Sequence, residues 1–179
     1  TWTVEGTDNY EGATASITVT IKNATITVTV TPNDLTYNGS EQELVTGTAS
    51  VGTIQYSLDG SSWSSTVPTG TDAKTYKVYY KVELANYDTV SSSVEVVIAK
   101  ASNSITLSST DNIEVVYGTA VTLPTATSAF GGITCSHTAD QLVNAGTYTV
   151  TWTVEGTDNY EGATASIIVI INKDTPSYT

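Results

Sequence analysis

The stretch GTYTVTWTVEGTDNYEGATASIIVII, residues 146–171, determines the fold class of this chain. Aromatic and β-branched residues alternate with threonine in its first part, and a second β-branched run follows the turn-forming residues EGTDNYEG. A period of two is typical of strands with one buried face, because successive side chains of a strand point to opposite sides of the sheet. The stretch therefore predicts two strands joined by a turn.

Strand signals of this kind recur along the chain. ITVTV at 26–30 and YKVYYKV at 76–82 are further examples, and turn signals such as YNGSE, LDGSS and AFGG separate the runs. No window shows a sustained 3.6-residue apolar repeat with helix caps. Many short strands at this spacing predict an all-β sandwich or barrel.

The period of two also assigns one row of each strand to a core. In YKVYYKV the lysines mark the solvent side, so the alternate row faces inward. Matching GTIQYS (52–57) with GGITCS (131–136) places Ile133 and Cys135 on the inner side as well, and we expect Cys135 to be a buried structural thiol. The residues expected to face inward in the two long strands are Tyr76, Val78, Tyr80, Val82, Tyr148, Val150, Trp152 and Val154.

The chain contains internal repeats. Residues 1–21 return almost unchanged at 151–171, and a weaker similarity relates the segment ending at Lys100 to the segment ending at Lys173. Such self-similarity is typical of a repeat array. We expect two related domains at 24–100 and 101–173, preceded at 1–23 by the last strand pair of another repeat and followed at 174–179 by a linker or the start of the next repeat.

Two substitutions distinguish the repeated copies: Thr18 and Thr20 correspond to Ile168 and Ile170. These positions belong to the outward row, where threonine suits solvent and isoleucine suits a covered surface. We therefore expect a neighbouring module or loop to touch Ile168 and Ile170.

Composition limits the classes of function. Eighteen acidic residues against six basic ones give a formal net charge of −12, and all the basic residues are lysines. Such a chain is repelled by nucleic acid and by anionic membrane surfaces, so we expect no nucleic-acid partner. No apolar run approaches the length needed to cross a bilayer, so we expect no membrane insertion. The single cysteine rules out an internal disulfide.

Two motifs resemble a known structural feature. TDAKTYKV and VNAGTYTV resemble the tyrosine corner of immunoglobulin-like folds, in which Asp or Asn lies four residues before the Tyr that begins strand F. The longer stretches at 56–82 and 145–173 are similar to tandem bacterial immunoglobulin-like repeats (MBG-type) of large surface proteins. This resemblance implies that 24–100 and 101–173 are two tandem immunoglobulin-like β-sandwich domains, preceded by the hairpin of another repeat. It also implies a secreted or wall-attached bacterial protein that uses the repeats as a stalk, with no catalytic residues and no cofactor.

Two hypotheses for the function follow. The first is a non-enzymatic structural spacer of an extracellular or cell-surface protein, whose partners are neighbouring immunoglobulin-like repeats of the same chain. The alternative is an adhesion module that binds a glycan or a host protein through exposed aromatic residues, with Trp63 and Tyr79 as candidate contacts.

Other chemistry has weaker support. Cys135 and His137 lie two residues apart, but no basic residue lies nearby in the sequence to activate a thiolate. GTDNYEG at 156–162 offers oxygen ligands for calcium, although its spacing suits a turn better. We expect no catalytic site and no metal site.

Residues 1–23 raise a separate question, because a lone two-stranded hairpin is marginal in water. The segment could fray, pack on the domain at 24–100, or exchange strands with another copy, since it is nearly identical to 151–171. We favour an ordered hairpin over fraying.

Overall fold

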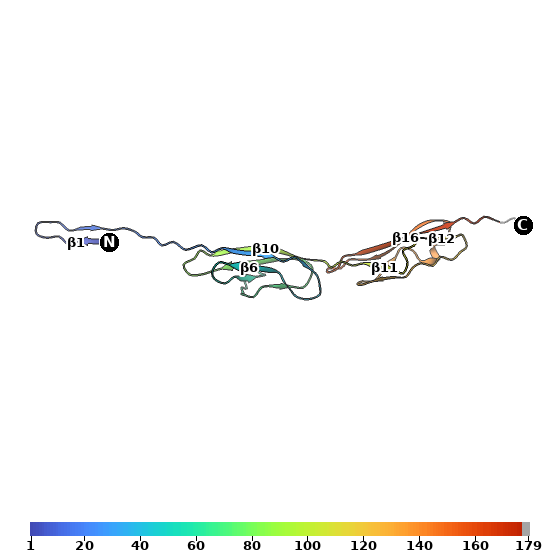
Figure 1. Ribbon diagram of the computed structural model, residues 1–179, viewed down its shortest axis with the longest axis horizontal. Helices are drawn as coiled ribbons and strands as arrows, with labels where there is room; N and C mark the ends of the chain where they lie inside the picture. The colour runs from blue at the N-terminus through green and yellow to red at the C-terminus, as the bar shows by residue number, and fades with distance from the viewer. Residues whose placement is uncertain (177–179) are drawn as a thin grey trace.

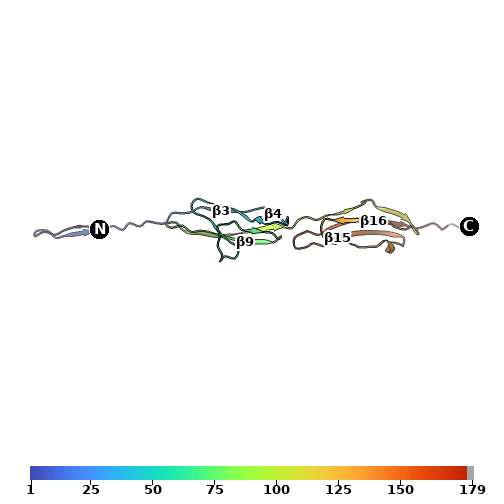
Figure 2. The same cartoon turned by 90° about the horizontal axis from the view of Figure 1, so that it is seen from below.

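The computed structural model describes residues 1–176, which form an elongated, almost entirely β molecule. A β-hairpin and two β-sandwiches follow one another along the long axis, with the hairpin at one end and the second sandwich toward the other (Figures 1 and 2). Both sandwiches have an immunoglobulin-like arrangement of strands. The predicted fold class, two tandem immunoglobulin-like sandwiches preceded by a hairpin, is confirmed.

The first sandwich has a four-stranded sheet in the order β4-β10-β9-β7, with the pairs β3-β6 and β5-β8 against it. Its first strand region is split: β3 pairs antiparallel with β6, and β4 then pairs parallel with the last strand, β10. The strands are β3 (Val28–Pro32), β4 (Leu35–Thr36), β5 (Gln42–Glu43), β6 (Val45–Ala49), β7 (Gln55–Ser57), β8 (Thr69–Gly70), β9 (Thr75–Val82) and β10 (Val90–Ala99).

The second sandwich repeats this plan with the sheet order β12-β16-β15-β14 and the pair β11-β13. Again the early strand β11 pairs antiparallel within one sheet, whereas β12 pairs parallel with the last strand, β16. The elements are β11 (Ile105–Leu107), β12 (Ile113–Val116), β13 (Ala126–Ser128), β14 (Thr134–Cys135), the 3-10 turn η1 (Ala139–Gln141), β15 (Gly146–Val154) and β16 (Ala163–Asn172).

Each sandwich encloses its own hydrophobic core, and the predicted inward rows supply its centre. Val78, Val82 and Val150 have no exposed surface, and Trp152 is only 5% exposed. The longer side chains that pack against the two cores from partly buried positions include Tyr76, Tyr80, Ile133 and Tyr148. The alternation predicted from the sequence is thus confirmed in both domains.

Both predicted tyrosine corners are present. The Tyr76 hydroxyl donates a hydrogen bond to the Asp72 carbonyl oxygen at 3.0 Å, and the Tyr148 hydroxyl donates to the Asn144 carbonyl oxygen at 2.9 Å. Each bond ties the start of a central strand to the connection that precedes it, as in other immunoglobulin-like folds.

The prediction that Cys135 is buried is wrong, because its side chain is exposed. Cys135 takes the position that Tyr56 has in the first sandwich, but there the following chain folds back and pairs with Tyr56 through Ser64. The connection that does this, residues 58–74, is seventeen residues long, whereas its counterpart, residues 136–145, has only ten. The shorter connection leaves the edge strand β14 uncovered.

The hairpin of β1 (Trp2–Val4) and β2 (Ala13–Ala15) packs on neither sandwich. Every residue from 1 to 25 is exposed, including Trp2 at 63% and Ile21 at 93%. Trp2 lies opposite Ala15, the register that Trp152 and Ala165 have in the second sandwich. Of the three outcomes considered for residues 1–23, packing on the domain at 24–100 is therefore not observed.

Cover over Ile168 and Ile170 comes from the same domain. The side-chain oxygen of Asn112 accepts a hydrogen bond from the Ile168 N–H at 2.9 Å, and Glu114 of β12 lies opposite Ile170. Ile168 remains 40% exposed and Ile170 is half-buried. Part of the predicted segment 174–179, residues 177–179, lies outside the described residues.

Candidate functional site

The best-defined polar contact between elements far apart in the sequence is the junction of the two sandwiches. The loop between β15 and β16 meets the tyrosine corner of the first sandwich there. The Asn159 side-chain oxygen accepts a hydrogen bond from the Ala73 N–H at 2.8 Å, and its amide nitrogen donates to the Asp72 carboxylate at 3.2 Å. One amide group thus satisfies both a donor and an acceptor of the neighbouring domain.

Aromatic packing supports the same contact. The Tyr160 ring stacks on Phe130 of its own domain, with ring centroids 3.8 Å apart. Its edge meets Tyr37 of the first sandwich at a centroid distance of 5.3 Å and an interplanar angle of 80°. Edge-to-face aromatic pairs of this kind contribute about 0.5–1.5 kcal/mol beyond the area they bury. Tyr160 therefore connects the two domains through apolar surface beside the hydrogen bonds of Asn159.

The linker is held by the same loop. β10 ends at Ala99, and two residues later Ala101 donates its N–H to the Asn159 carbonyl and accepts from the Glu161 N–H, both at 2.9 Å. Lys100 is the residue between Ala99 and Ala101, and its ammonium donates a hydrogen bond to the Thr157 carbonyl at 2.6 Å. A linker with so few residues between fixed points leaves little freedom for the domains to swing.

The first sandwich holds the chain that enters it in the same way. The Ala24 N–H donates to the Asn86 carbonyl, and the Asp88 N–H donates to the Ala24 carbonyl, both at 2.9 Å. Asn86 has a φ of 67°, a left-handed conformation that asparagine tolerates better than most residues. We call these two elements, 84–88 and 156–162, the Asn-Tyr loops, because each carries an Asn-Tyr pair at its linker contact.

Trp63 and Tyr79, the candidate ligand contacts, are both half-buried; Tyr79 belongs to the outer row of β9, and Trp63 lies in the connection after β7. The Lys81 ammonium lies 4.8 Å from the Trp63 ring centroid, and the Lys77 ammonium lies 4.9 Å from that of Tyr79. Lysine side chains so placed make cation–π contacts with the rings and partly cover them. Their role in binding stays a prediction.

A turn close to Trp63 is organised by one carboxylate. Asp59 accepts hydrogen bonds of 2.7 Å from the backbone N–H groups of Ser61 and Ser62 and from the hydroxyls of Ser57 and Ser62. These hydrogen bonds, the backbone ones first, hold the pKa of the Asp59 carboxyl far below its ordinary value, because they favour the charged form. The group stabilises the turn and requires no ligand to satisfy it.

The residues considered for other chemistry are not assembled into a site. The Cys135 thiol lies 3.1 Å from the His137 carbonyl, and the His137 ring lies 2.9 Å from the Ser136 hydroxyl. Within residues 1–176, no three His, Cys, Asp or Glu side chains are grouped to hold a metal ion. In the loop considered for calcium, Asn159 is engaged in the domain junction instead.

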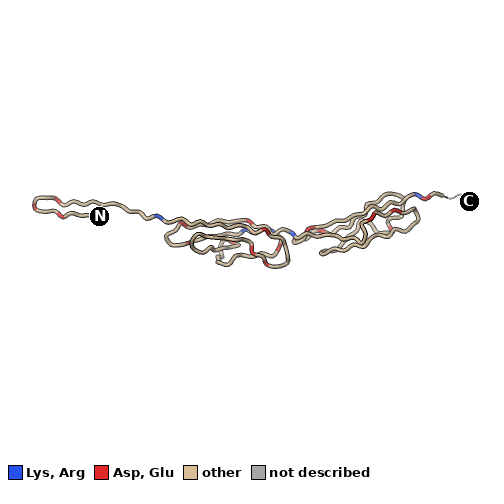
Figure 3. The backbone as a smooth tube through the Cα atoms, in the orientation of Figure 1, with Lys and Arg blue, Asp and Glu red and all other residues tan. Residues whose placement is uncertain are grey.

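The sequence reasoning missed the residues that receive the loop: Tyr37, Asp72, Ala73, Lys100 and Phe130. The available signal was the recurrence of Asn-Tyr at 9–10, 86–87 and 159–160, which indicates a repeat and a turn but does not by itself show what the loop contacts. Acidic positions are dispersed along the whole molecule rather than gathered at one surface (Figure 3). Over residues 1–176, no helix combines the length and the hydropathy of a transmembrane segment.

No protein-family model and no curated protein matches this chain. Among solved structures, it is similar to the fibronectin(III)-like modules of CbhA from Clostridium thermocellum. The two share 11% sequence identity, with 86% of this chain and 100% of that chain covered, at a TM-score of 0.32. So distant a likeness carries no argument here, and the fold assignment rests on the sheets, cores and tyrosine corners described above.

Proposed function

We propose that this chain is a non-enzymatic spacer module of a repetitive bacterial cell-surface or secreted protein, related to the MBG-type immunoglobulin-like repeats. The observation that carries the proposal is the domain junction, in which Asn159, Tyr160 and Lys100 fasten one sandwich to the end of the other. Stacked domains with short, clamped linkers keep a chain extended, and extension is the physical requirement for a stalk.

The repeat pattern supports the same role. Recurrence of 1–21 at 151–171 gives a unit of 150 residues that contains one domain of each type. In an array, stability is approximately the sum of each domain's own folding energy and its contacts with nearest neighbours, so units can be added without redesign. The partners proposed for the module are therefore neighbouring immunoglobulin-like repeats and, through residues 1–23, a second copy by strand exchange.

Small-angle scattering of the whole chain tests the spacer role. We expect an elongated particle, and we expect Asn159→Ala with Tyr160→Ala to broaden the distribution of interatomic distances and to shorten its maximum. The matched control is Asn9→Ala with Tyr10→Ala, which alters the identical sequence in the hairpin loop, where Tyr10 is 79% exposed.

Backbone relaxation of the isotope-labelled chain gives a second measure. In the wild type the two sandwiches should tumble together as one elongated body, whereas in the Asn159/Tyr160 variant each should tumble with a shorter correlation time. Independent tumbling of the sandwiches in the wild type would show that the junction does not stiffen the chain, and the spacer proposal would fail.

The alternative function, adhesion to a glycan or a host protein, is favoured by the two half-buried rings beside lysines on the β9 face. A glycan array probed with the wild type, Trp63→Ala and Tyr79→Ala tests it. Binding that both variants lose would support adhesion, and Trp2→Ala, which removes an exposed ring elsewhere, is the control.

A further inference from the structure

The far end of the second sandwich repeats the features with which the first sandwich receives an Asn-Tyr loop. Tyr117 follows β12 as Tyr37 follows β4, and each donates its N–H at 2.8 Å to the last strand of its sheet, at Asn172 and Ala99 respectively. Tyr37 packs against the incoming Tyr160, whereas Tyr117 is 55% exposed.

The tyrosine corner beside Tyr117 matches as well. Asn144 and Ala145 occupy the positions of Asp72 and Ala73, since each pair precedes the corner tyrosine by the same number of residues. Both Asn144 and Ala145 are exposed, and within the described residues the Ala145 N–H makes no hydrogen bond. The corner thus offers the donor that Ala73 uses, and an amide oxygen in place of the Asp72 carboxylate.

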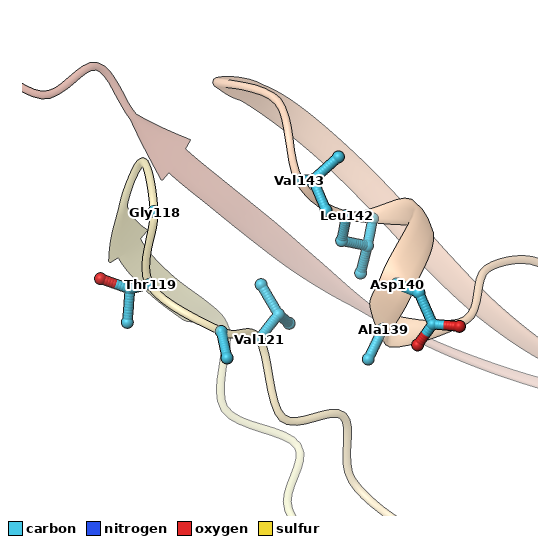
Figure 4. A pocket seen from close by; sticks show the side chains of 8 residues that line it. Gly118, Thr119, Val121, Ala139, Asp140, Leu142 and Val143 are labelled. Atoms are coloured by element: carbon cyan, nitrogen blue, oxygen red, sulfur yellow. The ribbon is translucent and has the colours of Figure 1, made fainter.

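A notch in the second sandwich is lined by the residues that directly follow Tyr117 and directly precede Asn144 (Figure 4). It has a volume of about 310 Å³ and lies between residues 118–121 and 139–143. Val121 and Leu142 form its buried floor, and Val143, which is 55% exposed, stands at its rim. In the first sandwich, pairing of β5 with β8 occupies the corresponding place.

We infer that Tyr117, Asn144, Ala145 and the adjoining notch form a docking surface for the Asn-Tyr loop of a domain like residues 24–100 that follows the second domain in the array. Asn86 would hydrogen-bond the Ala145 N–H, and Tyr87 would lie toward Tyr117. The inference rests on the spacer function proposed above, and it identifies the partner at the next junction.

The length of the linker between domains supports a domain like 24–100 as the partner at this docking surface. Residues 1–22 repeat the last two strands of the second domain, so Lys22 corresponds to Asn172, and Ala24 follows it by two residues. Ala101 follows Ala99, the end of β10, by the same two residues. A domain like 101–173 followed by a domain like 24–100 is therefore joined by a linker of the same length as the one between the two sandwiches of this chain.

The incoming loop is also held in the matching position. Ala24 is held by the Asn86 carbonyl and the Asp88 N–H, as Ala101 is held by the Asn159 carbonyl and the Glu161 N–H. Linkers of equal length, held by the same pair of backbone hydrogen bonds, would place the loop at Asn86 beside the corner of the preceding domain. Asn86 is exposed, and its side chain makes no hydrogen bond within the described residues.

A tandem chain tests the inference: residues 1–173 joined directly to 24–179, which keeps the repeat register, with Cys135→Ser in both units. Ala145→Cys in the first unit and Asn86→Cys in the second should form a disulfide in glutathione buffer. The reference pair is Ala73→Cys with Asn159→Cys, whose native residues are in contact. The negative control pairs Ala145→Cys with Ser93→Cys, an exposed position in β10.

We expect the effective concentration of the test pair to lie within about tenfold of the reference and at least about a hundredfold above the control. If the effective concentration of the test pair is no higher than that of the control, the inference is overturned. If the reference disulfide still forms in that case, the proposed spacer function is unaffected. Failure of the reference pair as well would remove the stacked junction on which both proposals rest. Disulfides formed mainly between separate tandem chains would also overturn the placement.

Amide exchange supplies a readout with the native side chains in place. Extending the chain should slow exchange of the first unit's Ala145 N–H at least about fivefold, the effect of one hydrogen bond of ordinary net strength. Asn86→Gly in the second unit should reverse the protection, because glycine accepts the left-handed backbone and removes only the side chain. Protection that persists in that variant would contradict the role of Asn86.

Discussion

At the scale of single residues, polar side chains at the ends of strands organise this molecule, whereas the cores consist of ordinary apolar packing. Tyr76 and Tyr148 tie each central strand to its preceding connection. Asn159 connects one domain to the next, and Asp59 shapes a turn. Each of these polar groups can be changed singly without opening a core, provided that in Tyr76 and Tyr148 only the hydroxyl is removed, because their rings pack against the cores.

Removing a corner hydroxyl should weaken only its own domain. We expect Tyr76→Phe to lower the free energy of unfolding of the first domain by about 1 kcal/mol, the net worth of one hydrogen bond. Tyr148→Phe should do the same in the second domain. Urea unfolding followed by tryptophan fluorescence measures both, and Tyr79→Phe on the same strand as Tyr76 is the control. An equal loss in Tyr79→Phe would contradict a specific role for the corner.

Asp59 should make the first domain sensitive to acid. Its pKa is depressed in the folded state by hydrogen bonds, so the unfolded chain, with a value near 3.8, binds the proton first as pH falls. The stabilisation is therefore present above that pH and is lost progressively below it. In Asp59→Asn, the urea midpoint of the first domain should fall less than in the wild type between about pH 4.5 and pH 2.5. Parallel curves for the two proteins would contradict this assignment.

At the scale of elements, the repeated sequence keeps one strand register in two settings. In the second sandwich, residues 152–154 of β15 (Gly146–Val154) pair with 163–165 of β16 (Ala163–Asn172) over a core. In the hairpin, Trp2–Val4 pair with Ala13–Ala15 in the same register, although every one of these residues is exposed. The turn and its cross-strand pairs therefore set this register without a core beneath them.

Deletion of residues 1–22 should leave both sandwiches as stable as before. Residues 1–25 are all exposed, so we expect the urea midpoints to correspond to free energies within about 0.5 kcal/mol of the full chain. A larger loss would reveal packing of the hairpin on a domain. Sedimentation of both proteins over a concentration series tests strand exchange, which predicts dimers of the full chain that the deletion abolishes.

At the scale of the whole molecule, the hairpin and the two sandwiches form a row along the long axis, so tension on an array would pass through each sandwich (Figure 1). In both domains an early strand runs parallel to the last one, β4 with β10 and β12 with β16. Pulling the chain ends apart slides such strands past each other and loads their hydrogen bonds together.

The second domain should therefore resist force better than the first. β12 pairs with β16 through four residues, Ile113 to Val116, whereas β4 pairs with β10 only through Leu35 and Thr36. Stretching single molecules should give two unfolding events of about 20–25 nm each, from roughly 75 residues per domain at the extended length per residue. Val115→Pro should lower the force of the stronger event, because proline cannot donate to the ladder. A decrease in the weaker event instead would reverse the assignment.

The sequence by itself determined the fold class and the facing of the central strands. Alternation at 76–82 and 148–154 depends only on the strand period, and the tyrosine corners depend on a spacing of four residues, so both are local signals. The internal repeat could also be recognised from the sequence alone, whereas the domain boundaries at 24, 100, 101 and 173 stay predictions.

Only the tertiary structure decided the exposure of Cys135 and the residues of the junction. Cys135 follows the strand pattern, but its burial depends on whether the connection that follows β14 is long enough to fold back over this edge strand. Asn159 and Asp72 meet across 87 residues because a linker clamped at Ala101 fixes how the second sandwich follows the first. Periodicity describes a strand and its own sheet, whereas contacts between separate bodies depend on geometry that accumulates along the whole chain.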